Sequence, residues 1–157
     1  MDDAYSQRGR RRDGALTLSI CTRCRDGRED AHDEERGGAR FARAILDAFA
    51  ERRGTLPPVV IRGVACMSQC KRPCTVALSA PGRFTYLFGD LDPVRDAHAV
   101  LDALALYASG EEGFMARDAR PEPMRAGILG RIPPIDTASA LVTTLASPAL
   151  ASLEPSR

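Results

Sequence analysis

Residues 63–93 read GVACMSQCKRPCTVALSAPGRFTYLFGDLDP and contain, in one run, three cysteines, a hairpin pattern and a helix start. Residues 75–78 and 84–88 are β-prone, and the APGR turn between them supplies the φ values that a chain reversal needs. Asp92 and Pro93 then form an N-cap and a first position typical of a helix. This run therefore predicts two antiparallel strands and a helix directly after the cysteines.

The sequence before this run adds two strands and a helix. Residues 15–20 (ALTLSI) alternate as a short strand whose end reaches Cys21. Residues 25–38 are polar and glycine-bearing, and they predict a loop or a frayed helix start that does not pack. An apolar stripe at helical spacing follows, made of Phe41, Ile45, Leu46 and Phe49. The β-branched residues 59–61 begin a second strand that continues to Cys66, so both strands end on a cysteine.

The helix predicted from Pro93 keeps an apolar stripe that includes Val94 and His98, and it ends at Gly110. We therefore expect His98 in the core. The resulting order, β-α-β-β-β-α, matches the thioredoxin-like core, in which a right-handed βαβ unit precedes a ββα unit. We predict a single α/β domain of this kind.

The chain divides into four predicted segments. Residues 15–110 carry the thioredoxin-like, cluster-binding domain. Residues 1–14 are polar and arginine-rich, which is typical of a disordered arm. Residues 111–134 contain four prolines and predict an extended arm packed on the domain, and residues 135–157 predict a flexible tail.

Composition excludes several classes of function. The chain has 22 basic and 21 acidic residues, with 5% aromatic residues and no Trp, so nothing points to nucleic-acid binding. No apolar run approaches the roughly 20 residues that span a bilayer. Because the N-terminus lacks the apolar stretch of a secretory signal, we expect a cytoplasmic protein. In that reducing compartment, the five cysteines are expected to be metal ligands or redox thiols.

The cysteines form two groups, Cys21-x2-Cys24 and Cys66-x3-Cys70-x3-Cys74. Each group follows a predicted strand, and ligands of α/β sheets bind outside the carboxyl ends of the strands. A close cysteine pair from each loop supplies the four thiolates of a 2Fe–2S cluster. Two such pairs also suit a closed tetrahedral zinc site. The CxxC pair alone stands where thioredoxins carry their catalytic cysteines, although the polar residues after it give no helix start that would lower a thiol pKa.

Residues 63–93 resemble an uncharacterised bacterial family of predicted metal-binding proteins. The resemblance includes SICTRC at residues 19–24 and RPEPMRAGILGRIPP at residues 120–134. The strand order and the two cysteine pairs also resemble the thioredoxin-like 2Fe–2S ferredoxins. In those ferredoxins the first pair follows strand one and a Cys-x3-Cys pair follows a later strand. The resemblance therefore implies four cluster ligands: Cys21, Cys24, Cys66 and Cys70. Cys74 is adjacent to them as an alternative ligand.

The resemblance further implies an electron carrier that is not an enzyme by itself. It also implies a redox protein as partner and a homodimer. One alternative is a zinc or other metal-binding or metal-delivery protein, and a less favoured one is a thiol-disulfide oxidoreductase. A ferredoxin requires reversible one-electron chemistry, whereas a delivery protein requires ligand exchange.

Overall fold

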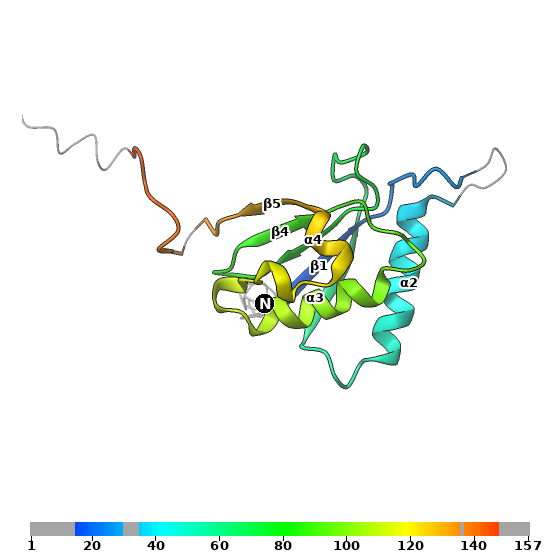
Figure 1. Cartoon of the computed structure of the whole chain (residues 1–157), viewed down its shortest axis with the longest axis horizontal. Helices are drawn as coiled ribbons and strands as arrows, with labels where there is room; N and C mark the ends of the chain where they lie inside the picture. The colour runs from blue at the N-terminus through cyan, green and yellow to red at the C-terminus, as the bar shows by residue number, and fades with distance from the viewer. Residues whose placement is uncertain (1–14, 30–34, 136, 148–157) are drawn as a thin grey trace, which may run out of the picture.

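The computed structural model describes residues 15–29, 35–135 and 137–147, and Figure 1 shows the arrangement of its elements. The predicted disordered arm at residues 1–14 and part of the predicted tail lie outside the described residues. The elements in chain order are β1 (Leu16–Cys21), α2 (Gly37–Glu51), β2 (Val59–Val64), β3 (Val76–Ser79), β4 (Thr85–Phe88), α3 (Ala97–Ser109), η2 (Glu111–Gly113), η3 (Arg117–Ala119), α4 (Glu122–Ala126) and β5 (Ile128–Ile132). The first six confirm the predicted β-α-β-β-β-α order.

Five strands form one sheet in the order β2-β1-β3-β4-β5. β1 runs parallel to β2, and the other neighbouring pairs are antiparallel. Helix α2 connects the two parallel strands, because a parallel pair requires a crossover, and β3, β4 and α3 form the following ββα unit. The predicted thioredoxin-like core is therefore present, and β5 extends it beside β4.

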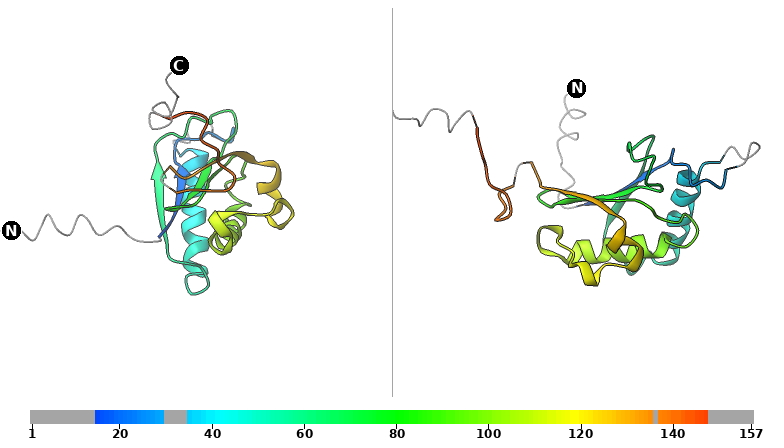
Figure 2. Two further views of the ribbon diagram at one scale, coloured as in Figure 1. Left: turned by 90° about the vertical axis from the view of Figure 1, so that its left-hand side faces the viewer. Right: turned by 45° about the horizontal axis from the view of Figure 1, so that its top comes forward.

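The helices of the described ranges lie on one side of the sheet, which gives the domain two layers (Figure 2). Leu16, Leu18 and Ile20 alternate along β1 and are buried toward these helices. On β4, Tyr86 and Phe88 point the same way, and their stacked rings lie 5.9 Å apart. The core therefore lies between sheet and helices. None of the described helices is long and apolar enough to cross a membrane.

Helix α2 packs on the sheet through one face. Phe41 and Ile45 are buried as predicted, and Ala48 continues their line at i+7. Leu46 is 51% exposed, because it points to one side of that line, so its predicted place in the core was wrong. The helix begins at Gly37, at the end of the segment that the sequence predicted as a loop or a frayed helix start.

Helix α3 begins one turn later than predicted. Asp92 Oδ1 accepts the Val94 N–H (2.8 Å) and so caps a separate turn before the helix. The helix buries a face made of Ala97, Val100, Leu101, Ala103, Leu104 and Tyr107. That face excludes His98, whose side chain is 59% exposed, so the prediction of a core histidine was wrong. Val94 is also exposed, whereas the predicted end at Gly110 is confirmed.

Residues 111–134, predicted as an extended arm, contain regular structure. They form two short 3-10 turns, helix α4 and strand β5, which pairs antiparallel with β4. Met115 and Met124 are buried in the core, and Arg120 donates to the Met115 carbonyl (3.0 Å) while lying over the ring of Tyr86. The sequence ILGRI carries a weak strand pattern, because a glycine stands at its centre.

Candidate functional site

The two cysteine loops leave the sheet side by side. Cys21, the last residue of β1, pairs with Val64, the last residue of β2. The Thr22 N–H continues this pairing by donating to the Val64 carbonyl (2.9 Å). Cys66 follows two residues after β2. The parallel pair therefore brings the start of both cysteine groups to the carboxyl edge of the sheet.

Cys21 is buried and surrounded by hydrogen-bond donors. Backbone N–H groups of Arg23 and Cys24 in its own loop and of Met67 in the other loop lie near its sulfur, as does the Cys24 thiol. Burial raises the pKa of Cys21, but these neighbouring donors outweigh burial and hold the pKa below its ordinary value. Cys21 therefore forms a thiolate more readily than an ordinary cysteine, and Met67 brings the second loop close to its sulfur.

Cys24 is buried beside Thr75, the residue that precedes β3. The Cys24 thiol donates to Thr75 Oγ1 at 3.8 Å, and the Thr75 carbonyl accepts the Cys21 N–H at 3.0 Å. Burial, followed by the hydrogen bond with Cys21, raises the pKa of Cys24 to about 11. The CxxC pair thus combines one thiol of lowered pKa with one of raised pKa. Thr75 bonds to both residues, with its hydroxyl to the Cys24 thiol and with its carbonyl to the Cys21 backbone N–H.

Cys74 belongs to the core. Its peptide bond with Pro73 is cis, its N–H donates to the Leu91 carbonyl (3.1 Å), and its side chain is fully buried. Burial, and then the charge of nearby Cys24, raises the pKa of Cys74 to about 12. A thiol in such surroundings behaves as a small apolar side chain. Cys74 therefore lies adjacent to the CxxC pair as a protonated, buried thiol.

Cys66 and Cys70 are exposed on the second loop. Cys66 Sγ accepts the Ser68 N–H (3.3 Å) within a turn in which Ser68 has a left-handed φ of 58°. Among the described residues, no three Cys, His, Asp or Glu side chains form a group that could hold a metal ion. A four-thiolate centre therefore requires Cys66 and Cys70 to turn inward toward Cys21.

The donor set fits a 2Fe–2S cluster in its chemistry. Two thiols come from each of two loops that touch, and a 2Fe–2S cluster takes four thiolates. Backbone N–H groups already point at the sulfurs of Cys21 and Cys66, and hydrogen bonds of this kind tune cluster potentials. A cluster held by all four thiols would require the second loop to turn inward.

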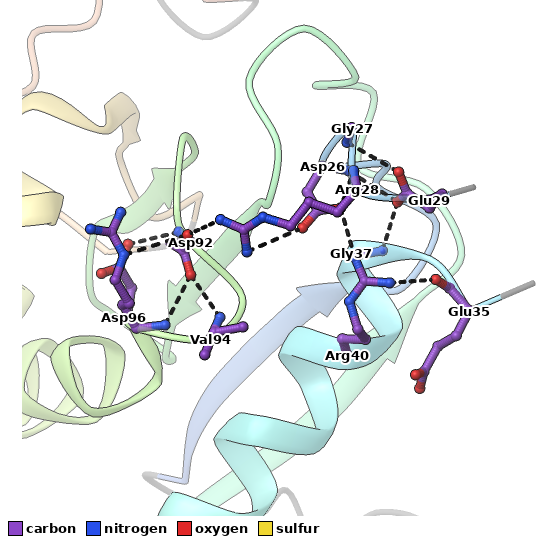
Figure 3. Close-up of polar contacts among 11 residues, drawn as sticks. Asp26, Gly27, Arg28, Glu29, Glu35, Gly37, Arg40, Asp92, Val94 and Asp96 are labelled. Atoms are coloured by element: carbon purple, nitrogen blue, oxygen red, sulfur yellow. Dashed lines mark hydrogen bonds and ion pairs between the residues drawn. The ribbon is translucent and has the colours of Figure 1, made fainter. Parts of the chain in front are cut away.

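The segment after Cys24 packs closely, contrary to its prediction as an unpacked loop (Figure 3). The Glu29 carboxylate accepts the N–H groups of three residues, Asp26 (3.0 Å), Gly27 (3.0 Å) and Gly37 (2.9 Å). The Gly38 N–H, in the first turn of α2, donates to the Cys24 carbonyl (3.0 Å). These bonds satisfy free N–H groups at the start of α2 and hold that helix against the CxxC loop.

Glu29→Gln is expected to lower stability at neutral pH but not near pH 2. Burial raises the pKa of Glu29, but the N–H donors from Gly37 and its neighbours outweigh it and lower the pKa from 4.5 to about 2. The ionised carboxylate therefore stabilises the fold above about pH 4.5, and this contribution is lost as the pH falls toward 2. Urea unfolding of both proteins between these pH values, followed by circular dichroism, measures the effect. A difference that stays constant with pH would contradict this account.

Comparisons with known proteins give a family match and similar solved structures. Residues 18–134 match the model of a family described as "Protein of unknown function (DUF1636)". No curated protein matches the chain. Two solved structures of a thioredoxin-like [2Fe-2S] ferredoxin from Aquifex aeolicus are similar to it, each at 19% identity and a TM-score of 0.44. They cover 74% of this chain and 92% and 97% of their own chains.

Proposed function

The chain belongs to the DUF1636 family, whose function is unknown, and we propose that it is a ferredoxin-like electron carrier that binds one 2Fe–2S cluster. The proposed ligands are the four thiols of the two cysteine pairs: Cys21, Cys24, Cys66 and Cys70. The observation that supports this most is the parallel pairing of β1 with β2, which continues through the Thr22 N–H to the Val64 carbonyl (2.9 Å) and starts both cysteine loops side by side. When bound, such a cluster takes up and releases one electron.

The burial of the four cysteines suits this role. Cys21 and Cys24 are buried and would hold the cluster from the side of the sheet, with backbone N–H groups stabilising the Cys21 thiolate. Cys66 and Cys70 are exposed and would hold it from the solvent side, where a partner redox protein can approach. This proposal assigns no catalytic residue, since the protein passes electrons to another protein and is not an enzyme by itself.

Purification without oxygen tests the cofactor. We expect reddish-brown protein with about two irons and two sulfides per chain, as a 2Fe–2S centre requires. One-electron reduction should produce a paramagnetic signal, measured by electron paramagnetic resonance. Colourless protein with one zinc per chain would show instead the alternative metal-binding or metal-delivery function, for which four thiolates are also a suitable site.

The CxxC pair supports a second candidate, a thiol-disulfide oxidoreductase. The lowered pKa of Cys21 and the raised pKa of its hydrogen-bonded neighbour Cys24 are the arrangement of an attacking and a resolving thiol. In that reaction Cys21 would attack a substrate disulfide and Cys24 would release the reduced substrate, leaving a Cys21–Cys24 disulfide. Insulin reduction by iron-free protein distinguishes the two functions, because the electron carrier is expected to show no turnover.

A further inference from the structure

A pocket of about 290 Å³ lies beside the cysteine loops, between the loop that follows Cys24 and the turn that precedes α3. This volume is at the small end of the range for ligand pockets. Its wall contains three apolar residues, Pro73, Leu91 and Pro93, and five charged ones, Asp26, Arg28, Asp90, Asp92 and Arg95. Carboxylates therefore outnumber guanidinium groups in the lining.

Asp26 carries a carboxylate oxygen that lacks a donor. Its Oδ1 accepts hydrogen bonds from the Arg40 side chain (2.7 Å) and the Arg28 backbone N–H (3.2 Å). Its Oδ2 is buried and accepts no hydrogen bond within the part of the chain that the structure describes, and the side chain is only 8% exposed. Buried polar atoms are almost always hydrogen-bonded, so Oδ2 is a binding position for an N–H group.

Arg28 covers this oxygen without satisfying it (Figure 3). Its Nη1 lies 3.7 Å from Asp26 Oδ2, beyond hydrogen-bond distance, while its Nη2 donates to Asp92 Oδ2 at 2.5 Å. That bond helps to hold the pKa of Asp92 well below its usual range. The Arg28 side chain is 54% exposed whereas that of Asp92 is 9% exposed, so Arg28 is the partner that can move into solvent. Its guanidinium therefore occupies a cation position from which a ligand can displace it.

We propose that this pocket binds a small ligand through a protonated amine, which replaces the Arg28 guanidinium and donates to Asp26 Oδ2 and Asp92. Arg40 and Arg72 already bond to Asp26 Oδ1 and Asp90, so the unsatisfied Asp26 Oδ2 beside the Asp92 carboxylate is what selects a cationic donor, and the apolar wall takes a short hydrocarbon chain. The apolar wall of Pro73, Leu91 and Pro93 favours an organic cation. The amine belongs either to a free alkylamine or to a lysine side chain of a protein.

The wall of this pocket is joined to the cysteine site. The Leu91 carbonyl accepts the Cys74 N–H (3.1 Å), and the Asp90 N–H donates to the Arg72 carbonyl (3.0 Å). The Arg72 side chain also donates to Asp90 Oδ2 (2.5 Å). A ligand bound here therefore lies against the segment before β3 that carries Cys74, but its recognition depends on the pocket alone and not on a cluster.

Ligand-observed saturation-transfer NMR with n-butylammonium, on the full chain at fixed ionic strength, tests the proposal. We expect saturable binding in the millimolar range, and none with n-butanol or butyrate. Asp26→Asn should weaken binding about fivefold, while Arg28→Gln should strengthen it about threefold, since it removes the competing cation. The exposed Asp47 on α2 provides the control, because Asp47→Asn should leave the affinity unchanged.

Two outcomes would overturn the proposal: no saturable binding to Arg28→Gln, or binding of n-butanol as strong as that of n-butylammonium. The Arg28→Gln variant tests the proposal even if Asp26→Asn does not fold, because the Arg28 side chain is largely exposed and its replacement should not disturb folding. Nα-acetyl-lysine amide identifies the source of the amine. Affinity equal to that of n-butylammonium supports a protein lysine, and much weaker affinity supports a free alkylamine.

Discussion

Replacing Cys21, Cys24, Cys66 or Cys70 singly with Ser is expected to abolish the 2Fe–2S cluster, whereas Cys74→Ser should keep it. A serine oxygen is a poorer iron ligand than a thiolate, and the cluster needs four thiolates. Iron and sulfide should therefore fall from about two of each per chain to near zero in the first four variants. Iron and sulfide analysis of anaerobically purified protein, with its visible absorption, measures the effect.

Cys74 is the matched control because it is a cysteine of the same site with a different environment. Its side chain is fully buried, and burial raises its pKa to about 12. Cys74→Ser buries a hydroxyl, so it should cost about 1–3 kcal/mol of stability and shift the potential, while two irons remain. Loss of iron from Cys74→Ser together with retention in Cys24→Ser would show that the second cysteine group supplies three ligands.

The central fold was predictable because its elements have strong local patterns. Alternation in ALTLSI, the APGR turn and the stripe through Phe41 and Ile45 depend on residues close in sequence, and each produced the predicted element. Strand β5 was not predictable in this way, because ILGRI becomes a strand by pairing with β4. The start of α3 was misplaced because Asp92 and Pro93 are equally suited to cap a single turn.

The site was predictable in position and not in detail. Because β1 and β2 are parallel neighbours, the ends of these strands place Cys21 and Cys66 near each other for any loop conformation. Whether a thiol is buried depends on the loop conformation, and the left-handed Ser68 lies between the exposed Cys66 and Cys70. No local sequence pattern predicts such a turn, so the spacing of the cysteines could not show which pair is buried and which is exposed.

The packing of residues 25–29 was missed for another reason. Polar composition was interpreted as exposure to solvent, but Glu29 directs its carboxylate to backbone N–H groups at the start of α2. The signal available in the sequence was the Gly37-Gly38 pair, since adjacent glycines at a helix start indicate a close approach of another backbone.

Gly38→Ala is expected to destabilise the protein by about 3 kcal/mol. A Cβ atom at this position would lie 2.2 Å from the Cys21 carbonyl oxygen and 3.0 Å from the Cys24 backbone nitrogen. Both atoms are backbone atoms of the CxxC loop, so no side-chain rotation relieves the clash. Gly54→Ala is the control, because a Cβ there meets no atom within 4 Å, and it should leave stability unchanged or slightly higher.

The same substitution should lower the iron content, because relieving the clash moves either the helix or the cysteines. Movement of α2 breaks the bond from the Gly38 N–H to the Cys24 carbonyl, and movement of the loop displaces Cys21 from the N–H groups that stabilise its thiolate. Chemical denaturation and iron analysis of Gly38→Ala and Gly54→Ala measure both effects. Normal stability in Gly38→Ala would contradict the contact between α2 and the CxxC loop. Normal iron content with reduced stability would show that α2 moves while the cysteines stay in place.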